Sequence, residues 1–274
     1  AFVTTSFVKA RKRARPEQVR IIPTKWVLAT KYLASNALNR VKARLVACEA
    51  VGRFVVENTW SPTVTMESAR IIFIVAALHQ CEVVSMDVKG AYLRGTRGRT
   101  DGQGEPDEVF LRMPRGLDLL DEYDRLKYQD AHGESMMWQC NANLYGLQDA
   151  GAIFYQFARG WLLRKKFVQS TVDPCIFVLR RDFPHNDFMI QGLYVDDTLN
   201  AFSSPAIKIW YFEAFEEQFE QSPDSGEGHP EFLAMQFKVS EDRRTIRVNT
   251  PKLWARLRTR LADVELPPVT SPVP

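Results

Sequence analysis

The feature that most constrains this chain is a pair of adjacent aspartates, Asp196 and Asp197, inside an otherwise apolar stretch. They end the sequence Tyr194-Val195-Asp196-Asp197. Aspartate is depleted in strands and neighbouring carboxylates repel each other, so a strand that buried both would be unstable. A tight hairpin with both acids at its tip would expose them, and a divalent cation would neutralise their charge. The pattern predicts such a hairpin, although an ordinary surface turn with two aspartates also satisfies it.

A third aspartate, Asp87, follows the apolar segment at residues 83–86. We expect residues 82–86 to form a strand that carries Asp87 at its end. Carboxylates at strand ends can gather around two magnesium ions roughly 4 Å apart. Such a site performs in-line phosphoryl transfer, in which catalysis is mostly positioning and charge neutralisation. The residues alone therefore indicate a nucleotidyl transferase or a nuclease.

The composition is that of a globular protein with a real core. Of 274 residues, 45% are hydrophobic and 25% are charged, which excludes disorder, collagen and a coiled coil. The longest apolar run, residues 71–78, is too short to cross a bilayer, and the basic N-terminal residues lack the apolar core of a signal peptide. Four cysteines without a C-x-x-C pair argue against a disulfide framework or a thiolate zinc site and suit a reducing compartment.

The net charge of +3 is unevenly distributed, because residues 1–24 form a basic arm and residues 213–231 are acidic. A basic arm predicts contact with a polyanion such as nucleic acid, although a solvated tail has the same composition. The cations of the arm are Lys9, Arg11, Lys12, Arg13, Arg15 and Arg20. The chain opens on Ala1 and closes on a proline-rich stretch, so we expect a piece of a longer polypeptide that ends in a linker.

Strands and helices interleave irregularly, which favours an α+β fold over a doubly wound sheet. Residues 25–30 and 41–47 are expected to pair around a turn at Ser35-Asn36. Thr65 is expected to cap a helix whose apolar face holds Ile71, Ile72, Val75 and Leu78.

Two further helices are expected, at residues 150–166 and from Ser204-Pro205 onward. The first should turn Phe154, Phe157, Trp161 and Leu162 inward, and the second Ile207, Tyr211, Phe215 and Phe219. Further strands are expected at residues 109–113, 136–140, 175–179, 188–201, 231–239 and 245–249, and an exposed loop at residues 94–106.

Nine segments of the chain match one family in order. They are Lys25-Trp26-Val27, Lys42-Ala43-Arg44-Leu45-Val46-Ala47, Trp60-Ser61-Pro62-Thr63-Val64, Asp87-Val88-Lys89-Gly90-Ala91-Tyr92-Leu93, Val109-Phe110-Leu111-Arg112-Met113-Pro114, Leu144-Tyr145-Gly146-Leu147, Asp173-Pro174-Cys175, Tyr194-Val195-Asp196-Asp197 and Phe232-Leu233-Ala234-Met235. Through them the chain resembles the reverse transcriptase domain of a copia-type LTR retrotransposon polyprotein.

The resemblance implies a right-hand polymerase with a split βαβ, ferredoxin-like palm. The basic arm would be residues 1–24, and fingers and palm residues 25–240, with fingers mainly 25–80 and palm mainly 81–240. Residues 241–274 would hold the start of a thumb and a proline-rich linker. Asp87 and Asp197 match the acids that bridge both metals, and Asp196 matches the third catalytic carboxylate.

The resemblance also implies a dNTP site. Tyr92 matches the aromatic steric gate that rejects ribonucleotides, and Arg44 and Lys42 match the fingers cations that bind the triphosphate. Tyr145 and Gly146 match the segment beneath the incoming nucleotide and template base. Without the resemblance, these residues are a half-buried strand aromatic, solvated strand charges and a plain turn.

A last matching segment resembles the primer grip, although by composition alone it is a core strand. Its residues are Phe232, Leu233, Ala234 and Met235. The chain departs from the family there, because Ala234 stands where glycine is usual, and Asn200 stands where the hairpin strand is apolar. Gln148, Asp149 and Gly151 alter the usual Lys-Gln-Ala-Pro, which removes a cation near the template, adds an acid and is expected to weaken the grip on nucleic acid.

The resemblance implies an RNA-directed DNA polymerase that uses two Mg²⁺ ions, with Mn²⁺ as a substitute. Its partners would be an RNA template, a DNA or RNA primer, dNTPs, and a second copy or an adjoining ribonuclease H domain, without a membrane. Cytoplasmic virus-like particles with a nuclear stage are the expected location. The alternative is a catalytically decayed or co-opted fragment that binds nucleic acid or a protein partner. A nuclease is disfavoured, because it has no triphosphate for the expected cations to hold.

Overall fold

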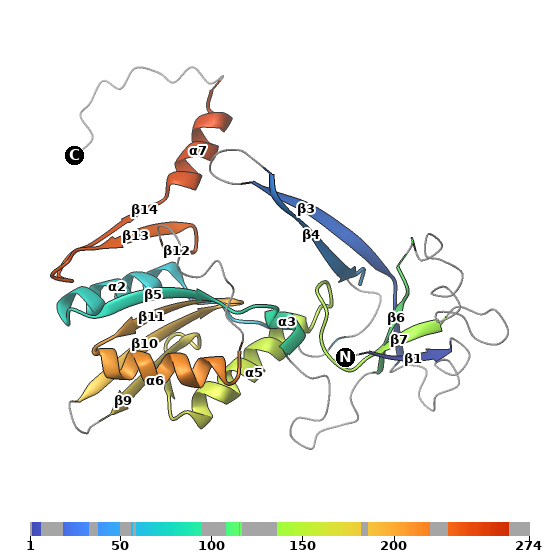
Figure 1. The fold of residues 1–274 in the computed structure, drawn as a ribbon, viewed down its shortest axis with the longest axis horizontal. Helices are drawn as coiled ribbons and strands as arrows, with labels where there is room; N and C mark the ends of the chain where they lie inside the picture. The colour runs from blue at the N-terminus through green and yellow to red at the C-terminus, as the bar shows by residue number, and fades with distance from the viewer. Residues whose placement is uncertain are drawn as a thin grey trace. The chain divides into compact units, whose positions relative to one another are not determined.

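A computed structural model describes residues 2–6, 19–32, 38–49, 56, 59–94, 108–114, 116, 136–181, 186–219 and 230–262 of the chain (Figure 1). The chain forms two compact units. The first comprises Ala1–Pro62 and Gly90–Lys166, and the second comprises Thr63–Lys89 and Phe167–Pro274. The expected boundaries of fingers, palm and thumb stay a prediction.

The second unit is built on a five-stranded antiparallel sheet in the order β5-β11-β10-β9-β8. Its strands are β5 (Glu82–Asp87), β8 (Val168–Gln169), β9 (Ile176–Arg181), β10 (Asp187–Tyr194) and β11 (Asp197–Phe202). The strand predicted before Asp87 is confirmed. The alternating stretch at residues 188–201 is also confirmed, as a hairpin of β10 and β11 that turns at Val195-Asp196.

Helix α2 (Met66–Leu78) packs on one face of this sheet and begins where the sequence predicts. The Thr65 hydroxyl accepts the N–H of Ser68 at 3.1 Å, as an N-cap does. The predicted apolar face is wrong at Ile71 and Leu78, which are 57% and 73% exposed, whereas Ile72 is buried as predicted and Val75 is half-buried. The residues of α2 that are buried are Ala69, Ile72, Phe73 and Ala76.

Helix α2 presents a different face to the sheet from the one predicted, and the fit of Ile72 against Gly192 of β10 explains part of this difference. A Cβ on Gly192 would lie 2.9 Å from the Ile72 Cδ1 atom, so this glycine gives Ile72 its place. The Phe73 ring lies 5.1 Å from Phe237, which fixes the other side of the buried face. Apolar residues surround much of α2, so their spacing alone does not determine which of them turn inward.

Helix α6 (Pro205–Glu216) lies on the opposite face of the sheet (Figure 1). Its N-cap Ser204 accepts the N–H of Ile207 at 3.3 Å. The Tyr211 hydroxyl donates to Gln191 Oε1 at 2.9 Å, whereas the next residue, Gly192, faces α2. The predicted inward residues are confirmed, since all four are buried: Ile207, Tyr211, Phe215 and Phe219.

The second unit ends in a three-stranded sheet and a helix, α7 (Pro251–Arg260). Its strands are β12 (Glu231–Phe232), β13 (Met235–Val239) and β14 (Ile246–Asn249). The continuous strand predicted for residues 231–239 is interrupted at Leu233 and Ala234, where φ is 52° and 61°. No residue of α7 is buried against the described part of the chain.

The first unit contains a four-stranded sheet in the order β1-β7-β6-β2 and a separate two-stranded hairpin. The sheet consists of β1 (Phe2–Ser6), β2 (Val19–Ile22), β6 (Glu108–Arg112) and β7 (Met136–Cys140). The hairpin consists of β3 (Thr24–Tyr32) and β4 (Leu38–Ala47) and confirms the predicted pairing. The expected turn at Ser35-Asn36, most of the basic arm and the expected loop beyond Arg94 lie outside the described residues.

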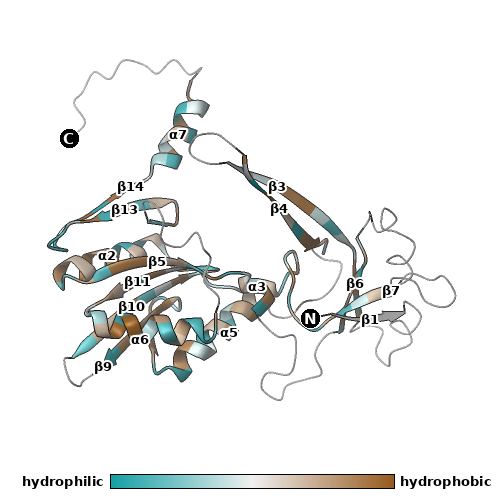
Figure 2. Cartoon of the chain, in the orientation of Figure 1, coloured by the Kyte–Doolittle hydropathy of each residue, from teal (hydrophilic) through white to brown (hydrophobic). Residues whose placement is uncertain are grey.

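Helix α5 (Ala150–Arg164) completes the first unit together with the short helix α3 (Ala91–Arg94). Figure 2 shows hydrophilic and hydrophobic patches alternating on α5, as in an amphipathic helix. Phe154, Trp161 and Leu162 are buried as predicted, whereas Phe157 is only half-buried. In the described part of the chain, no helix combines the length and the hydropathy that crossing a bilayer requires.

Candidate active site

Three carboxylates meet where β5 ends and the β10–β11 hairpin turns. Asp197 is the direct cross-strand partner of Asp87. The backbone oxygen of Asp196 accepts the N–H of Val88 at 2.8 Å, which holds the turn against the end of β5. One carboxylate oxygen from each of the three half-buried aspartates lies within 4.8 Å of the others. The sequence predicts this gathering, because both apolar segments end in acids.

The turn that carries these acids has a strained backbone. Val195 has φ 53°, although a β-branched residue rarely adopts the left-handed region. Two-residue hairpins require positive φ in their turn, so the connection between β10 and β11 imposes this conformation. Such strain costs roughly 1–3 kcal/mol and is concentrated at functional sites.

The electrostatics of the cluster favour a bound cation. The pKa of Asp197 is raised to about 6, chiefly by burial and further by the negative charges of Asp196, Asp87 and Glu231. A divalent cation would reverse this effect by compensating the negative charge. Carboxylate oxygens are hard donors that suit Mg²⁺ and Mn²⁺, so the residues present fit such an ion.

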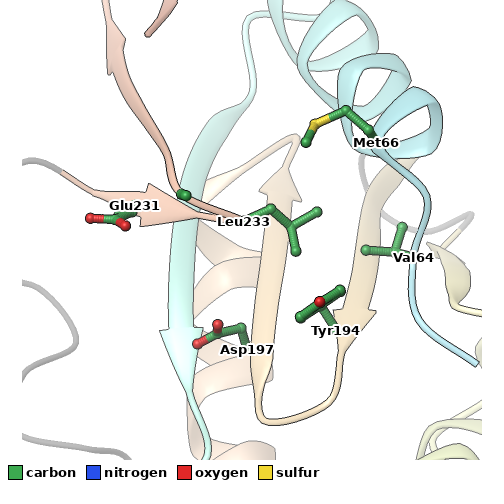
Figure 3. A pocket seen from close by; sticks show the side chains of 7 residues that line it. Val64, Met66, Tyr194, Asp197, Glu231 and Leu233 are labelled. Atoms are coloured by element: carbon green, nitrogen blue, oxygen red, sulfur yellow. The ribbon is translucent and has the colours of Figure 1, made fainter. Parts of the chain in front are cut away.

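A pocket of about 700 Å³ opens beside Asp197 (Figure 3). Its lining residues are Val64, Met66, Tyr194, Asp197, Glu231, Leu233 and Ala234. Leu233 projects into the pocket between Met66 and Tyr194 in this view. Phe232 and Met235, which the sequence groups with Leu233 and Ala234, are buried instead and pack in the core.

A second group of predicted residues gathers in the first unit. The rings of Tyr92 and Tyr145 meet edge to face at 5.1 Å, and the Arg44 guanidinium lies 5.8 Å from the centroid of the Tyr145 ring. Tyr92 also packs against a buried cluster that includes Ala47, which fixes its position. Lys42 lies two residues before Arg44, half-buried on the same face of β4.

Gly146 permits a close backbone approach, but the partner is the chain itself. Its φ is +89°, and a Cβ there would lie 2.1 Å from the backbone oxygen of Ala47. The Ala47 N–H donates to the Tyr145 oxygen at 2.7 Å. The turn that carries Tyr145 is therefore fastened to the end of β4.

The acid expected at Asp149 is present, but its carboxylate is buried and paired. Asp149 is 7% exposed, and its Oδ2 accepts a hydrogen bond from Arg20 Nη1 at 2.8 Å. Arg20 is itself 2% exposed, so it is an internal cation rather than part of a solvated basic arm. Sequence reasoning missed this pair, although a cation within the apolar run of β2 is a signal that it needs a buried partner.

Asn200 lies inside the sheet and is fully buried. Its Nδ2 atom donates to the Thr198 hydroxyl at 2.9 Å, whereas its Oδ1 atom has no hydrogen-bond partner among the described residues. The departure at this position therefore places an unsatisfied acceptor in the core of the hairpin.

The structure also explains the matching segment Asp173-Pro174-Cys175. Asp173 accepts the backbone N–H groups of Thr65 at 3.1 Å and Cys175 at 2.9 Å. Burial alone would raise the pKa of Asp173, but hydrogen bonds from Ser68, Cys175 and Thr65 lower it overall. This aspartate holds the start of α2 beside the start of β9, so its role is structural.

An α+β fold with three clustered carboxylates on a hairpin and an adjoining strand is consistent with the nucleotidyltransferase class. The chain matches the family model described as "Reverse transcriptase (RNA-dependent DNA polymerase)" over residues 11–222. The chain belongs to this family, and its resemblance to copia-type retrotransposon polyproteins is confirmed.

Curated relatives carry the same assignment in their names. The retrovirus-related Pol polyprotein from transposon RE1 of Arabidopsis thaliana is 31% identical over 194 residues, which are 70% of this chain and 12% of that protein. The corresponding polyprotein from transposon TNT 1-94 of Nicotiana tabacum is 31% identical over 186 residues, 67% of this chain and 12% of that protein. The chain thus spans about 12% of the length of these relatives.

A solved structure of telomerase from Candida albicans, in complex with a fragment of telomeric RNA, is also similar. Its TM-score is 0.41 at 10% sequence identity, over 96% of this chain and 53% of that chain.

Proposed function

We propose that this chain is an RNA-directed DNA polymerase domain that extends a primer 3′-hydroxyl with dNTPs. The observation that carries the proposal is the cluster of Asp87, Asp196 and Asp197, whose oxygens lie within 4.8 Å of one another. Membership of the reverse transcriptase family supports the same reaction. In this reaction the primer 3′-oxygen attacks the α-phosphorus of the dNTP, and pyrophosphate leaves.

Two Mg²⁺ ions, or Mn²⁺ as substitutes, would be held by the carboxylates of Asp87, Asp196 and Asp197. When bound, these ions would lower the pKa of the primer hydroxyl and neutralise the charge of the triphosphate. The contribution of the chain is to hold its carboxylates together on paired strands, so that little reorganisation is needed during the reaction.

The other site residues would bind and orient the substrates. Arg44, and Lys42 beside it, would bind the triphosphate, a task that suits a forked guanidinium. Tyr92 would exclude a ribose 2′-hydroxyl by steric overlap, and Tyr145 and Gly146 would support the nucleotide and the template base. Leu233 and Ala234, which line the pocket beside Asp197, would contact the primer end.

The finer architecture belongs to the same proposal. The second unit would hold the palm, with the carboxylates, and the start of the thumb, and the β3–β4 hairpin would belong to the fingers. An RNA template, a DNA or RNA primer and dNTPs would be the partners, with a second copy or a ribonuclease H domain adjoining. Virus-like particles in the cytoplasm would be the location.

Primer extension on an RNA template with Mg²⁺ and dNTPs tests the proposal. Asp197→Asn is expected to abolish extension, because it removes one charge that holds the cations. Asp242→Asn is the matched control, since Asp242 is an exposed acid in the turn between β13 and β14. Calorimetry with Mg²⁺ alone gives a readout besides activity, and binding should be lost in Asp197→Asn only.

Extension that persists in Asp197→Asn would contradict the assignment of the aspartates. Template–primer binding without extension by the unaltered chain would instead favour the decayed or co-opted fragment.

A further inference from the structure

A buried ion cluster in the first unit joins three segments that are distant in sequence. Arg20 of β2 donates through Nε and Nη2 to Glu49 Oε1 at 2.9 and 2.6 Å, and through Nη2 to Oε2 at 2.7 Å. Its Nη1 atom donates to Asp149 Oδ2 at 2.8 Å. The side chains of Arg20 and Glu49 are 2% and 0% exposed. One planar guanidinium therefore bridges two carboxylates out of solvent, a geometry that its fork suits.

The cluster holds the chain directly after the turn that carries Tyr145. Glu49 Oε2 also accepts the backbone N–H of Gln148 at 2.8 Å. Asp149 is the N-cap residue of α5, yet its side chain makes no capping hydrogen bond and turns to Arg20 instead. Because the Asp149 carboxylate binds Arg20 instead of a helix N–H group, it fixes the start of α5 to β2.

The same turn is fastened to β4 on its other side. The Ala47 N–H donates to the Tyr145 oxygen at 2.7 Å, and Gly146 lies so close to Ala47 that a side chain there would overlap it. Two residues beyond Ala47 the chain reaches Glu49. The turn is thus held at both ends, by the backbone of β4 and by the ion cluster.

This double attachment determines where the Tyr145 ring lies. The ring contacts Tyr92 and lies beside Arg44, the residues that the proposed function assigns to the dNTP. Buried ion pairs contribute little net stability, because desolvation offsets their attraction. What the cluster supplies here is a set of directed hydrogen bonds between β2, Glu49 and the start of α5. The hydrogen bonds and charges of Asp149 and Glu49 outweigh burial and raise the pKa of Arg20, so the guanidinium remains charged.

We propose that Arg20 is a positioning residue for the incoming dNTP, which acts by holding the Tyr145-Gly146 turn through Glu49 and Asp149. The inference rests on the proposed function for the identity of the ligand. It assigns Arg20 an effect on nucleotide affinity rather than on the chemical step, because the cluster holds the turn that carries Tyr145 and Gly146, which the proposed function assigns to nucleotide binding.

The test is Arg20→Lys, which keeps the charge but loses the planar fork. Single-nucleotide incorporation on a template–primer should show a KM for dNTP raised about fivefold or more, with kcat within about twofold. Arg243→Lys is the matched control, because Arg243 pairs with Glu82 at 3.6 Å in the second unit. If Arg20→Lys does not fold, Asp149→Asn replaces it, with the same direction expected.

A second readout separates the inference from the proposed function. Binding of a dNTP analogue with an imido bridge between its α- and β-phosphates is measured by calorimetry in Mg²⁺, where no turnover occurs.

If the unaltered chain extends primers but Arg20→Lys leaves the KM unchanged, or lowers only the active fraction, the inference is overturned and the function stands. If the unaltered chain does not extend, the proposed function fails, and weaker analogue binding in Arg20→Lys still supports the positioning role. Equal analogue affinity in both proteins, or no binding by the unaltered chain, overturns it.

Discussion

Asp197 on β11 lies directly opposite Asp87 on β5, as a cross-strand pair of the central sheet. Like charges in this position repel each other, so the pair destabilises the sheet that holds it. The arrangement is explained if the sheet gains a ligand there, because a cation that binds only the folded state stabilises it. The carboxylates are then a functional feature for which the fold gives up stability.

The first prediction concerns the pH dependence of the metal-free protein. The pKa of Asp197 is about 6 in the folded chain, against an ordinary value of 3.8. The folded state therefore holds this proton more tightly than the unfolded state, and the stability it contributes is lost as the pH rises through 6. Asp197→Asn should raise the free energy of unfolding by roughly 1–3 kcal/mol at pH 8, with a difference that disappears near pH 4.

Urea denaturation in EDTA at several pH values, with and without the substitution, measures this effect. Equal stabilities at pH 8 would show that Asp197 titrates normally. With Mg²⁺ present the unaltered chain should be more stable than Asp197→Asn, because only the unaltered chain gains the binding free energy of the cation.

The second prediction concerns Gly146. Gly146→Ala adds a Cβ that meets the Ala47 oxygen at 2.1 Å, in a backbone with φ +89°. Gly116→Ala is a matched control, since Gly116 has φ +102° and no atom of the described residues lies within 4 Å of the added Cβ. The free energy of unfolding of the control should fall by roughly 1–2 kcal/mol, the cost of the left-handed backbone for a residue with a Cβ. In Gly146→Ala it should fall further, because the added Cβ also overlaps the Ala47 oxygen. Thermal unfolding of both variants gives the difference, and equal losses would mean that the turn can move away from β4.

The third prediction concerns Ala234, which departs from the usual glycine and has φ 61°. Ala234→Gly removes the strain of the left-handed region, although it also makes the unfolded chain more flexible. The net gain should be about 0.5–1 kcal/mol. Ala255→Gly in the exposed helix α7 should instead lose about 1 kcal/mol. Chemical denaturation measures the free energy of unfolding of both variants, and changes of opposite sign are expected. A decrease in both would mean that the loop around residue 234 accommodates alanine without strain.

Local signals in the sequence were enough for much of the fold. The hairpin tip is predictable because acids interrupt an apolar run, and the starts of α2 and α6 because Thr65 and Ser204 are good caps. The apolar run around Arg20 signals a buried partner, but the identity of the partners is not predictable, because Glu49 and Asp149 meet Arg20 only after distant segments have folded together. The buried face of α2 is not predictable for the same reason, since the position of Ile72 depends on its contact with Gly192 of β10, which is distant in sequence.

The last prediction concerns Asn200, whose Oδ1 atom is buried with no hydrogen-bond partner among the described residues. An unsatisfied buried acceptor costs roughly 1–3 kcal/mol, and Asn200→Leu removes it while nearly keeping the volume. The Thr198 hydroxyl loses a donor but lies 3.4 Å from the Met86 oxygen, to which it donates. The free energy of unfolding of Asn200→Leu should therefore be higher by about 1 kcal/mol. Thr198→Val removes a hydrogen-bonded group, so it should not raise the free energy of unfolding. Urea denaturation distinguishes them. A less stable Asn200→Leu would show that Oδ1 accepts from a buried water, so that the amide is a satisfied element of the sheet beneath Asp87 and Asp197.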